Sequence, residues 1–402
     1  MSGKEAKAVV PKLRFPEFRD AGAWEVKRLG GYLVGKPEYG VNAPAVPFQE
    51  NLPAYLRITD ISEEGKIVKS NRVSVDLRAK REQYLSVGDI VLARTGASVG
   101  KSYKYRSKDG KLVFAGFLIR IKSNPEKLNS EFLFQYLYTG RYWRWVEFSS
   151  ARSGQPGING AEYASMLLPI PPELSEQQKI AHCLSSLDEV IGLQAKKVQA
   201  LKQHKKGLMQ QLFPAEGETT PHLRFPEFRE AGAWEVKRLG EVCIICNGSS
   251  NAQDHVDDGA YPLFDRSEEI KRSSRYLFDA EAVIIPGEGM RFIPKYYCGK
   301  FDLHQRAYAL SDFREVGKFI YYQLGALKGV LASKAVMSTV LSLRMPILET
   351  FKLVIPSSGE QQKIAHCLSS LDEVIGLESH KLDALKNLKK GLMQQLFPQE
   401  VA

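Results

Sequence analysis

Two long stretches of the chain carry apolar residues at spacings that alternate between four and three. This heptad pattern is typical of coiled-coil helices. Ser175 and Gln178 have the spacing of a capping box, so the first helix is expected to begin at Ser175. Pro214 and Pro398 end the two predicted helices. About 38 residues at 1.5 Å each predict a rod roughly 57 Å long. The predicted seam residues are Ile180, Leu184, Leu187, Ile191, Val198, Leu201, Leu208 and Leu212 in the first helix, and Ile364, Leu368, Leu371, Ile375, Leu382, Leu385, Leu392 and Leu396 in the second.

The chain repeats itself around these helices. Residues 11–30 (PKLRFPEFRDAGAWEVKRLG) and 221–240 (PHLRFPEFREAGAWEVKRLG) differ at two positions. Residues 176–193 and 360–377 both read EQQKIAHCLSSLDEVIGL, and each copy later continues into KKGLMQQLFP. The segments between the repeats resemble each other only faintly, and the second is 26 residues shorter. The chain is therefore a duplication with two divergent inserts.

We call the repeated parts the frame and the segments between them the first and second inserts. A near-identical frame around divergent inserts favours two equivalent docking sites and two different recognition surfaces. Recombination that keeps the frame homogeneous would leave the same pattern without a functional demand. The expected divisions are an opening segment (1–30), the first insert (31–174), the first helix (175–214), a linker with the second opening segment (215–240), the second insert (241–358) and the second helix (359–398).

Two copies of one apolar stripe favour pairing of the helices with each other. If the halves are related by a pseudo-twofold axis, the helices run antiparallel and hold the inserts apart. Each insert reads as a mixed α/β module, so the predicted fold class is α+β. Strands are predicted at 55–62, 87–95 and 111–122, and an amphipathic helix at 130–148. The faint counterparts in the second insert are 260–270, 280–287, 304–311 and 317–331, which suggests one fold under two surfaces.

Composition narrows the class of protein without identifying it. The 402 residues include 56 Lys and Arg against 46 Asp and Glu, which gives a net charge of +10 and permits a polyanion partner. No apolar run approaches the roughly 20 residues that a membrane helix requires. The N-terminus lacks the apolar core of a signal peptide, and five cysteines are too few for a disulfide framework. We therefore expect a cytoplasmic protein with no membrane contact.

Motifs that could carry catalysis fail on spacing. Residues 93–102 (ARTGASVGKS) resemble a phosphate-binding P-loop, but Gly96 and Gly100 enclose three residues where that loop needs four. An exposed glycine turn suited to close approach to DNA is the better reading, and residues 287–291 (GEGMR) offer a turn at the matching place. Cys243 and Cys246 form a solitary pair in an apolar run, so we expect buried thiols and no metal site. No catalytic centre is expected in this chain.

The repeated motifs resemble the specificity (S) subunits of type I restriction–modification systems. The resemblance rests on LRFPEF with the following W and KRLG (13–30 and 223–240), on EQQKIA opening each long helix, and on a proline-bearing strand before each helix, at 167–172 and 353–356. It covers almost the whole chain. The double occurrence in one order makes it highly specific.

The resemblance implies a division of labour. Each insert would be a target recognition domain that reads one half of a split, asymmetric site in double-stranded DNA. The helices would dock two methyltransferase (M) subunits, which carry S-adenosylmethionine and methylate adenine at N6. Restriction (R) subunits would use ATP and Mg to cleave unmethylated DNA. No cofactor is expected in this chain, and a modification-only system without a nuclease partner remains open.

Base reading favours Arg, Lys, Asn, Gln and Ser on exposed turns. A solvated loop residue is the alternative reading at each position. The predicted DNA-binding residues of the first insert are Tyr39, Asn42, Arg94, Ser98, Lys101, Arg152, Gln155 and Asn159, and those of the second insert are Asn247, Arg266, Arg291 and Lys334, with the stretch up to Gln253 beside Asn247.

Two other classes of function stay open at this stage. A coiled-coil assembly scaffold would bind proteins through its inserts and show neither sequence preference nor steep salt dependence on DNA. A nucleotide-dependent DNA-modifying enzyme would show turnover by the purified chain alone.

Overall fold

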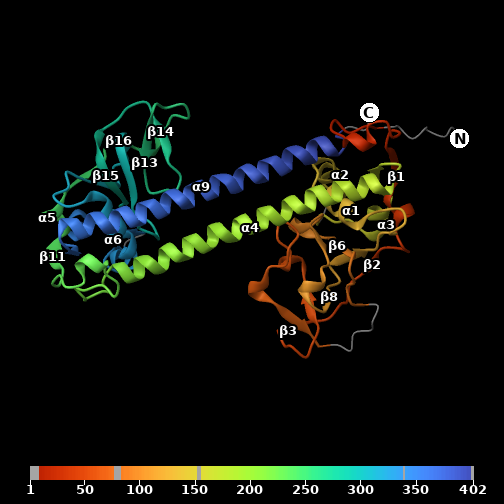
Figure 1. Ribbon diagram of the computed structural model, residues 1–402, viewed down its shortest axis with the longest axis horizontal. Coiled ribbons are helices and arrows are strands. Elements are labelled where there is room, and N and C mark those ends of the chain that lie inside the picture. The colour runs from red at the N-terminus through yellow and green to blue at the C-terminus, as the bar shows by residue number, and fades with distance from the viewer. Residues whose placement is uncertain (1–8, 77–82, 152–154, 338–339, 400–402) are drawn as a thin grey trace. The chain divides into compact units, whose positions relative to one another are not determined.

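The computed structural model describes residues 9–76, 83–151, 155–337 and 340–399. The chain divides into two compact units, Met1–Leu193 with Lys381–Ala402, and Gln194–His380. Each unit contains one insert. The helices α4 (Leu174–Leu212) and α9 (Ser358–Leu396), 39 residues each, contribute residues to both units (Figure 1). No helix in the described part of the chain has the length and hydrophobicity needed to cross a membrane.

The two long helices pair in antiparallel fashion within each unit. In the second unit, Gln194 of α4 donates from Nε2 to the backbone oxygen of Glu378 at 2.8 Å, and Lys205 pairs with Asp372 at 2.6 Å. As the residue number rises along α4, the residue number of its contact in α9 falls, so the two helices run in opposite directions. In the first unit, Lys389 of α9 pairs with Asp188 of α4 at 2.7 Å, which is the duplicated copy of the Lys205–Asp372 pair.

All the predicted seam residues are buried or half-buried. Ile180 and Leu184, and their copies Ile364 and Leu368, belong to the two main hydrophobic cores. The prediction that Ser175 caps α4 is wrong. The helix already begins at Leu174, and the Ser175 hydroxyl donates to the Glu173 carboxylate at 3.0 Å instead of accepting a helix N–H group.

The helix ends are held by matching aromatic clusters. Phe397, which follows α9, packs with Trp24 and Phe132 in the first unit, with ring centroids 5.2–6.4 Å apart. Phe213, which follows α4, packs in the same way with Trp234 and Phe319 in the second unit. Each opening segment therefore packs on the far end of one long helix.

The first insert holds two four-stranded sheets, in the orders β2-β9-β6-β7 and β3-β5-β4-β8. The single helix predicted at 130–148 is in fact two. Thr139 interrupts it, because its hydroxyl donates to the Tyr136 carbonyl and also accepts the Tyr142 N–H at the start of the second helix. The elements are β2 (Glu38–Tyr39), β3 (Ala45–Pro47), β4 (Ala54–Leu56), β5 (Val73–Val75), β6 (Ile90–Ala93), β7 (Ser102–Lys104), β8 (Leu112–Phe114), β9 (Leu118–Ile121), α1 (Ser130–Tyr136), α2 (Gly140–Ser150) and α3 (Gly160–Ser165); β10 (Leu167–Ile170) pairs with β1 (Glu25–Arg28) of the opening segment.

The second insert holds a six-stranded sheet in the order β12-β17-β15-β16-β13-β14. Its elements are α5 (Leu239–Val242), β12 (Ile244–Asn247), β13 (Tyr261–Phe264), β14 (Lys271–Ser273), β15 (Phe278–Pro286), β16 (Lys295–Leu303), β17 (Ala307–Ser311), α6 (Gly317–Ala326), α7 (Lys328–Ser333), β18 (Val336–Met337), β19 (Leu341–Ser342) and α8 (Met345–Glu349); β20 (Lys352–Ile355) pairs with β11 (Glu235–Arg238).

The two inserts share one topology, as the sequence predicts. The order β2-β9-β6-β7 of the first insert matches β12-β17-β15-β16 of the second. Both inserts also contain a parallel strand pair next to this group of four strands. It is β4 with β8 in the first insert and β13 with β16 in the second. β16 is one continuous strand where the first insert has β7 and β8, which accounts for part of the difference in length. Together with the paired helices, this confirms the predicted fold class.

Candidate nucleic-acid interface

Three predicted loops of the first insert meet on one surface. The guanidinium of Arg94 lies 4.9 Å from the ring centroid of Tyr39, and the Tyr39 hydroxyl accepts the Gly160 N–H at 3.0 Å. The glycine turn after β6 joins the third loop, because Gly96 donates from its backbone to the Pro156 carbonyl at 3.0 Å. Residues about 120 positions apart are thus joined in one cluster that we call the first reading surface.

Asn42, Gln155 and Asn159 lie on or beside the first reading surface. Gln155 is exposed, and its amide nitrogen lies 3.3 Å from where a Cβ on Gly96 would be. Asn159 also has a structural role, because its side chain accepts the Glu162 N–H at 2.9 Å and caps α3. Asn42 faces Gly116 in the turn between β8 and β9. Arg152 lies outside the described residues.

Ser98 and Lys101 lie on the connection from β6 to β7. Lys101 pairs with Glu63 at 2.6 Å, so part of its charge is already neutralised. Ser98 is half-buried and ends a short 3-10 helix, Gly96–Ser98. The strand β7 follows, where a phosphate-binding P-loop would lead into a helix.

The structure brings three of the four predicted residues of the second insert to neighbouring loops. Asn247 ends β12 and donates from Nδ2 to the Gln305 carbonyl at 3.4 Å. Arg266 follows β13, and its Nη1 lies 3.7 Å from a carboxylate oxygen of Glu288 in the turn after β15. Arg291 is in that same turn and pairs with Glu268 at 3.7 Å.

Lys334 does not join this group. It follows α7 and lines a groove with Thr219, Val236 and Lys352, which belong to the linker and to the β11–β20 pair. The second reading surface, as defined by Asn247, Arg266 and Glu288 with their loops, therefore excludes Lys334.

Sequence reasoning missed the turn between β8 and β9 and its counterpart between β16 and β17. Phe117 in the first turn is 58% exposed. Arg306 in the second turn donates from Nη1 to both carboxylate oxygens of Glu288, at 2.8 and 2.9 Å. Both turns lie within segments that the sequence predicts as strands, 111–122 and 304–311. In the sequence, the first turn is indicated by Gly116 between two apolar runs. The second is indicated by three consecutive polar residues, 304–306, before an apolar run.

The sequence profile of the family described as "Type I restriction modification DNA specificity domain" matches residues 53–203 and 232–387, about three quarters of the chain. The chain belongs to this family. It is 23% identical to the type I restriction enzyme MjaVIII specificity subunit of Methanocaldococcus jannaschii, over 96% of this chain and 93% of that protein. It is 27% identical to the type I restriction enzyme EcoDI specificity subunit of Escherichia coli, over 41% of this chain and 37% of that protein.

The fold is shared with solved specificity subunits. The S subunit of a type I restriction–modification system from M. genitalium matches with a TM-score of 0.67 at 15% identity, over 98% of this chain and 100% of that chain. The two family matches fall on the two halves of the duplication, and each covers most of one insert. The protein is therefore a DNA sequence-specificity subunit with two target recognition domains.

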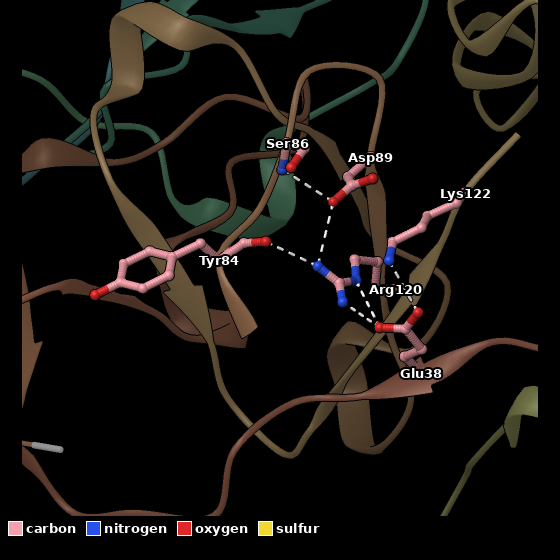
Figure 2. A network of polar contacts seen from close by, with 6 residues as sticks. All are labelled: Glu38, Tyr84, Ser86, Asp89, Arg120 and Lys122. Atoms are coloured by element: carbon pink, nitrogen blue, oxygen red, sulfur yellow. Dashed lines mark hydrogen bonds and ion pairs between the residues drawn. The ribbon is translucent and has the colours of Figure 1, made fainter. Parts of the chain in front are cut away.

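A buried ionic network fixes the strand that carries Tyr39 in this specificity subunit. Figure 2 shows Arg120 of β9 between Glu38, Asp89 and the backbone of Tyr84. Arg120 is buried and donates to Glu38 of β2 at 3.0 Å from Nε, and to the Tyr84 carbonyl at 2.8 Å. Lys122 adds a second contact to Glu38 at 3.0 Å. Because Glu38 precedes Tyr39, the network holds one edge of the first reading surface.

Two carboxylates of the network have pKa values that are shifted in opposite directions. Burial opposes ionisation of Glu38, but the hydrogen bonds from Arg120 and Lys122 outweigh it and hold the pKa of Glu38 below its ordinary value. Burial raises the pKa of Asp89, and the charge of Arg120 only partly offsets it. By strand register, the second insert has Cys246 and Ala309 where the first has Glu38 and Arg120. The polar anchor therefore belongs to the first insert alone.

The cysteines give no sign of a metal centre. Cys243 is buried, and burial raises the pKa of its thiol to about 12. Cys246 is half-buried, so the expectation that both thiols are buried holds fully only for Cys243. Within the described ranges, no three His, Cys, Asp or Glu side chains are grouped so that they could hold a metal ion.

Proposed function

We propose that this specificity subunit reads a bipartite, asymmetric site in double-stranded DNA, one half with each insert, and docks two copies of one methyltransferase subunit on its duplicated frame. The observation that carries the proposal is the contrast between the two parts of the duplication. The frame repeats residues that face solvent, whereas the reading surfaces of the inserts differ in almost every side chain.

The repeated exposed residues support a common partner. Leu193 and its copy Leu377 are 66% and 71% exposed, and Val190 and Val374 are exposed beside them. Side chains that face solvent contribute little to the packing of this chain, so packing alone does not explain why the same apolar residues recur. Exposed apolar patches on a soluble protein are typical of protein–protein interaction sites.

Polar contacts repeat elsewhere on the frame, near the start of each long helix. Glu17 pairs with Lys179 at 3.0 Å, and the copy Glu227 pairs with Lys363 at 3.1 Å. These pairs are exposed and contribute little to stability. Two copies of one surface, each beside one insert, suit two copies of one partner.

Catalysis is assigned to the partners under this proposal. The methyltransferase subunits would bind S-adenosylmethionine and modify adenine at N6, and restriction subunits, where present, would supply ATP- and Mg-dependent cleavage. This chain would contribute DNA sequence recognition and assembly, with no chemistry of its own.

The first test is a map of methylation. The chain is co-expressed with the type I methyltransferase subunit from its own source in a host free of adenine methylation, and N6-methyladenine is mapped across the host genome. We expect a split motif of two short defined halves around a gap of fixed length. If the folded chains co-purify but no methylation appears, the assembly-scaffold alternative is favoured.

The second test counts docked subunits. Leu193→Asp and Leu377→Asp each place a charge on one copy of the exposed patch, so each is expected to lose one of two methyltransferase subunits in native mass spectrometry. Gln199→Asp is the matched control, because its exposed position corresponds to Asp383 in the second copy. Two retained subunits in both variants would exclude this patch as the docking surface.

A further inference from the structure

The turn between β8 and β9 and the turn between β16 and β17 are the same structural element. Both lead into the strand that pairs with the first strand of the insert, β9 with β2 and β17 with β12. Strand register makes Phe117 equivalent to Arg306 and Gly116 equivalent to Gln305.

The backbone of both turns is held by equivalent hydrogen bonds. One bond closes the turn itself, a second ties it to the loop after the first strand, and a third ties it to the turn after β6 or β15. In the first insert, these bonds join Leu118 N to Ala115 O at 2.8 Å, Gly116 N to Val41 O at 2.8 Å and Arg94 N to Phe117 O at 3.1 Å. In the second insert, in the same order, they join Ala307 N to His304 O at 2.9 Å, Gln305 N to Ser250 O at 2.9 Å and Gly287 N to Arg306 O at 2.8 Å.

The fit around both turns is close enough to require glycine. A Cβ on Gly40 would lie 2.2 Å from the Ala115 carbonyl oxygen, and one on Gly248 would lie 1.9 Å from the Leu303 carbonyl oxygen. Gly40 and Gly248 are equivalent in register. One backbone arrangement is therefore kept in both inserts while the side chains that it presents differ.

Phe117 and Arg306 are the side chains that differ most in chemistry. Each is 58% exposed, Phe117 as a residue and Arg306 in its side chain. In the first insert, the turn presents the apolar ring of Phe117, whose backbone carbonyl accepts the Arg94 N–H at 3.1 Å. In the second insert, Arg306 and Arg266 both contact the half-buried carboxylate of Glu288.

Glu288 fixes the orientation of Arg306 without using all its donors. Both contacts to the carboxylate come from Nη1. Among the described residues, Nε and Nη2 of Arg306 have no hydrogen-bond partner. These two nitrogens form one planar edge of the guanidinium, and such an edge donates in bidentate fashion to O6 and N7 of guanine in the major groove.

Neighbouring side chains keep the turn rigid. The Arg306 N–H donates to Nδ1 of His304 at 3.1 Å, which needs that nitrogen unprotonated. Burial lowers the pKa of His304, helped by the nearby arginines, so the neutral ring persists at neutral pH. Gln305 donates from Nε2 to Oδ1 of Asn251 at 2.6 Å. A side chain held in place before binding loses little entropy when it contacts a base.

We propose that this turn is a specificity-determining element of both inserts. Arg306 reads a guanine in the half-site of the second insert, with Glu288 as its positioning residue. Phe117 makes the equivalent apolar contact in the half-site of the first insert, for which the thymine methyl group is the major-groove partner. The inference rests on the proposed function, because it presumes that each insert reads one half-site.

The test compares methylation motifs of three variants in the co-expressed complex. Arg306→Ala is expected to reduce discrimination at one guanine position by roughly 5- to 150-fold and to leave the other half-site unchanged. Phe117→Ala is the reciprocal control and is expected to relax one position in the other half-site. Arg306→Lys keeps the charge but lacks the rigid planar pair of donors, so it should weaken discrimination at the same position as Arg306→Ala while methylation persists.

Glu288→Gln tests the positioning role. It is expected to weaken discrimination at that same guanine with an unchanged melting temperature. The inference is overturned if Arg306→Lys keeps full discrimination, or if Arg306→Ala lowers methylation evenly at all sites with the motif intact, as a phosphate contact would. A wild-type complex that yields no split motif would instead contradict the proposed function.

Discussion

Tyr39 and Asn247 occupy the same position in the two inserts. Each ends the first strand of its insert, opposite Ile119 and Tyr308 respectively. The sequence singled out the two residues from unrelated motifs. Their equivalence indicates that the inserts present different side chains from one framework.

Substitution of the glycine that follows each of these residues should destabilise the unit that contains it. Gly40→Ala and Gly248→Ala place a methyl group against backbone carbonyl oxygens that cannot move alone, so each should lower the free energy of unfolding by about 1–3 kcal/mol. Urea denaturation measures the change. Gly207→Ala is the control. A Cβ at this position would meet no described atom within 4 Å beyond its own stretch of helix, and alanine favours a helix, so stability should hold or rise by up to ~1 kcal/mol.

The two buried ion pairs of the frame should differ in strength. Glu176 pairs with Arg14 and also accepts the Trp24 indole N–H at 3.2 Å, whereas among the described residues the Glu360 carboxylate pairs only with Arg224. Removing one partner of a buried pair costs about 3–5 kcal/mol.

We therefore expect Glu176→Ala to destabilise the first unit more than the matched Glu360→Ala destabilises the second, as measured by hydrogen exchange. The equivalent indole nitrogen of Trp234 has no hydrogen-bond partner among the described residues, so Glu360→Ala removes no hydrogen bond from it. Equal losses would contradict the assigned role of the Trp24 contact.

The Glu38 network predicts a pH dependence confined to the first insert. The folded-state pKa of Glu38 lies below its ordinary value of 4.5, so its stabilising contribution is present above pH 4.5 and is lost as the pH falls through the folded-state pKa. Glu38→Gln should remove on the order of 1 kcal/mol at neutral pH, a modest value because Glu38 is partly exposed.

Unfolding measured from pH 7 to pH 3 should show the wild-type advantage over Glu38→Gln shrinking on acidification. Asp89 has the opposite effect on stability, because burial raises its pKa. Its protonation at low pH removes the free-energy cost of keeping a charged carboxylate buried. A gap between wild type and variant that stays constant with pH would exclude an ionic contribution from Glu38.

The first reading surface predicts a change in DNA specificity. Arg94→Ala and Gln155→Ala should each cost on the order of 1–3 kcal/mol in site-specific binding and relax one position of the first half-site. Lys334→Ala is the comparison, since Lys334 lies apart from the second reading surface. Unchanged affinity and motif in the Arg94 and Gln155 variants would remove these loops from the interface.

The sequence predicts the frame well because its information is periodic and repeated. A heptad stripe such as Ile180, Leu184 and Leu187 needs no long-range contact to be recognised, and two copies confirm each other. The exact start or end of a helix is predicted less well where a single side chain determines it. Thr139 divides the helix predicted at 130–148, and the Ser175 hydroxyl turns to Glu173.

The reading surfaces are harder to predict, because strand pairing assembles them from distant segments. Tyr39, Arg94 and Gly160 come together only after β2, β6 and α3 take their places. The sequence pointed to loops that the structure brings together, but not to the turns that carry Phe117 and Arg306, since a three-residue turn between two apolar strands looks like one strand. The buried Arg120 network also escaped prediction, because its partners lie 31 to 84 residues apart.

Exchange of one insert tests the central claim most directly. Residues 241–351 of the second insert are replaced by the corresponding segment of another family member, and N6-methyladenine is mapped in the co-expressed complex beside the wild type. We predict a split motif in which the half-site of the second insert changes and that of the first insert stays the same. A motif that changes in both halves, or in neither, would contradict the assignment of one half-site to each insert.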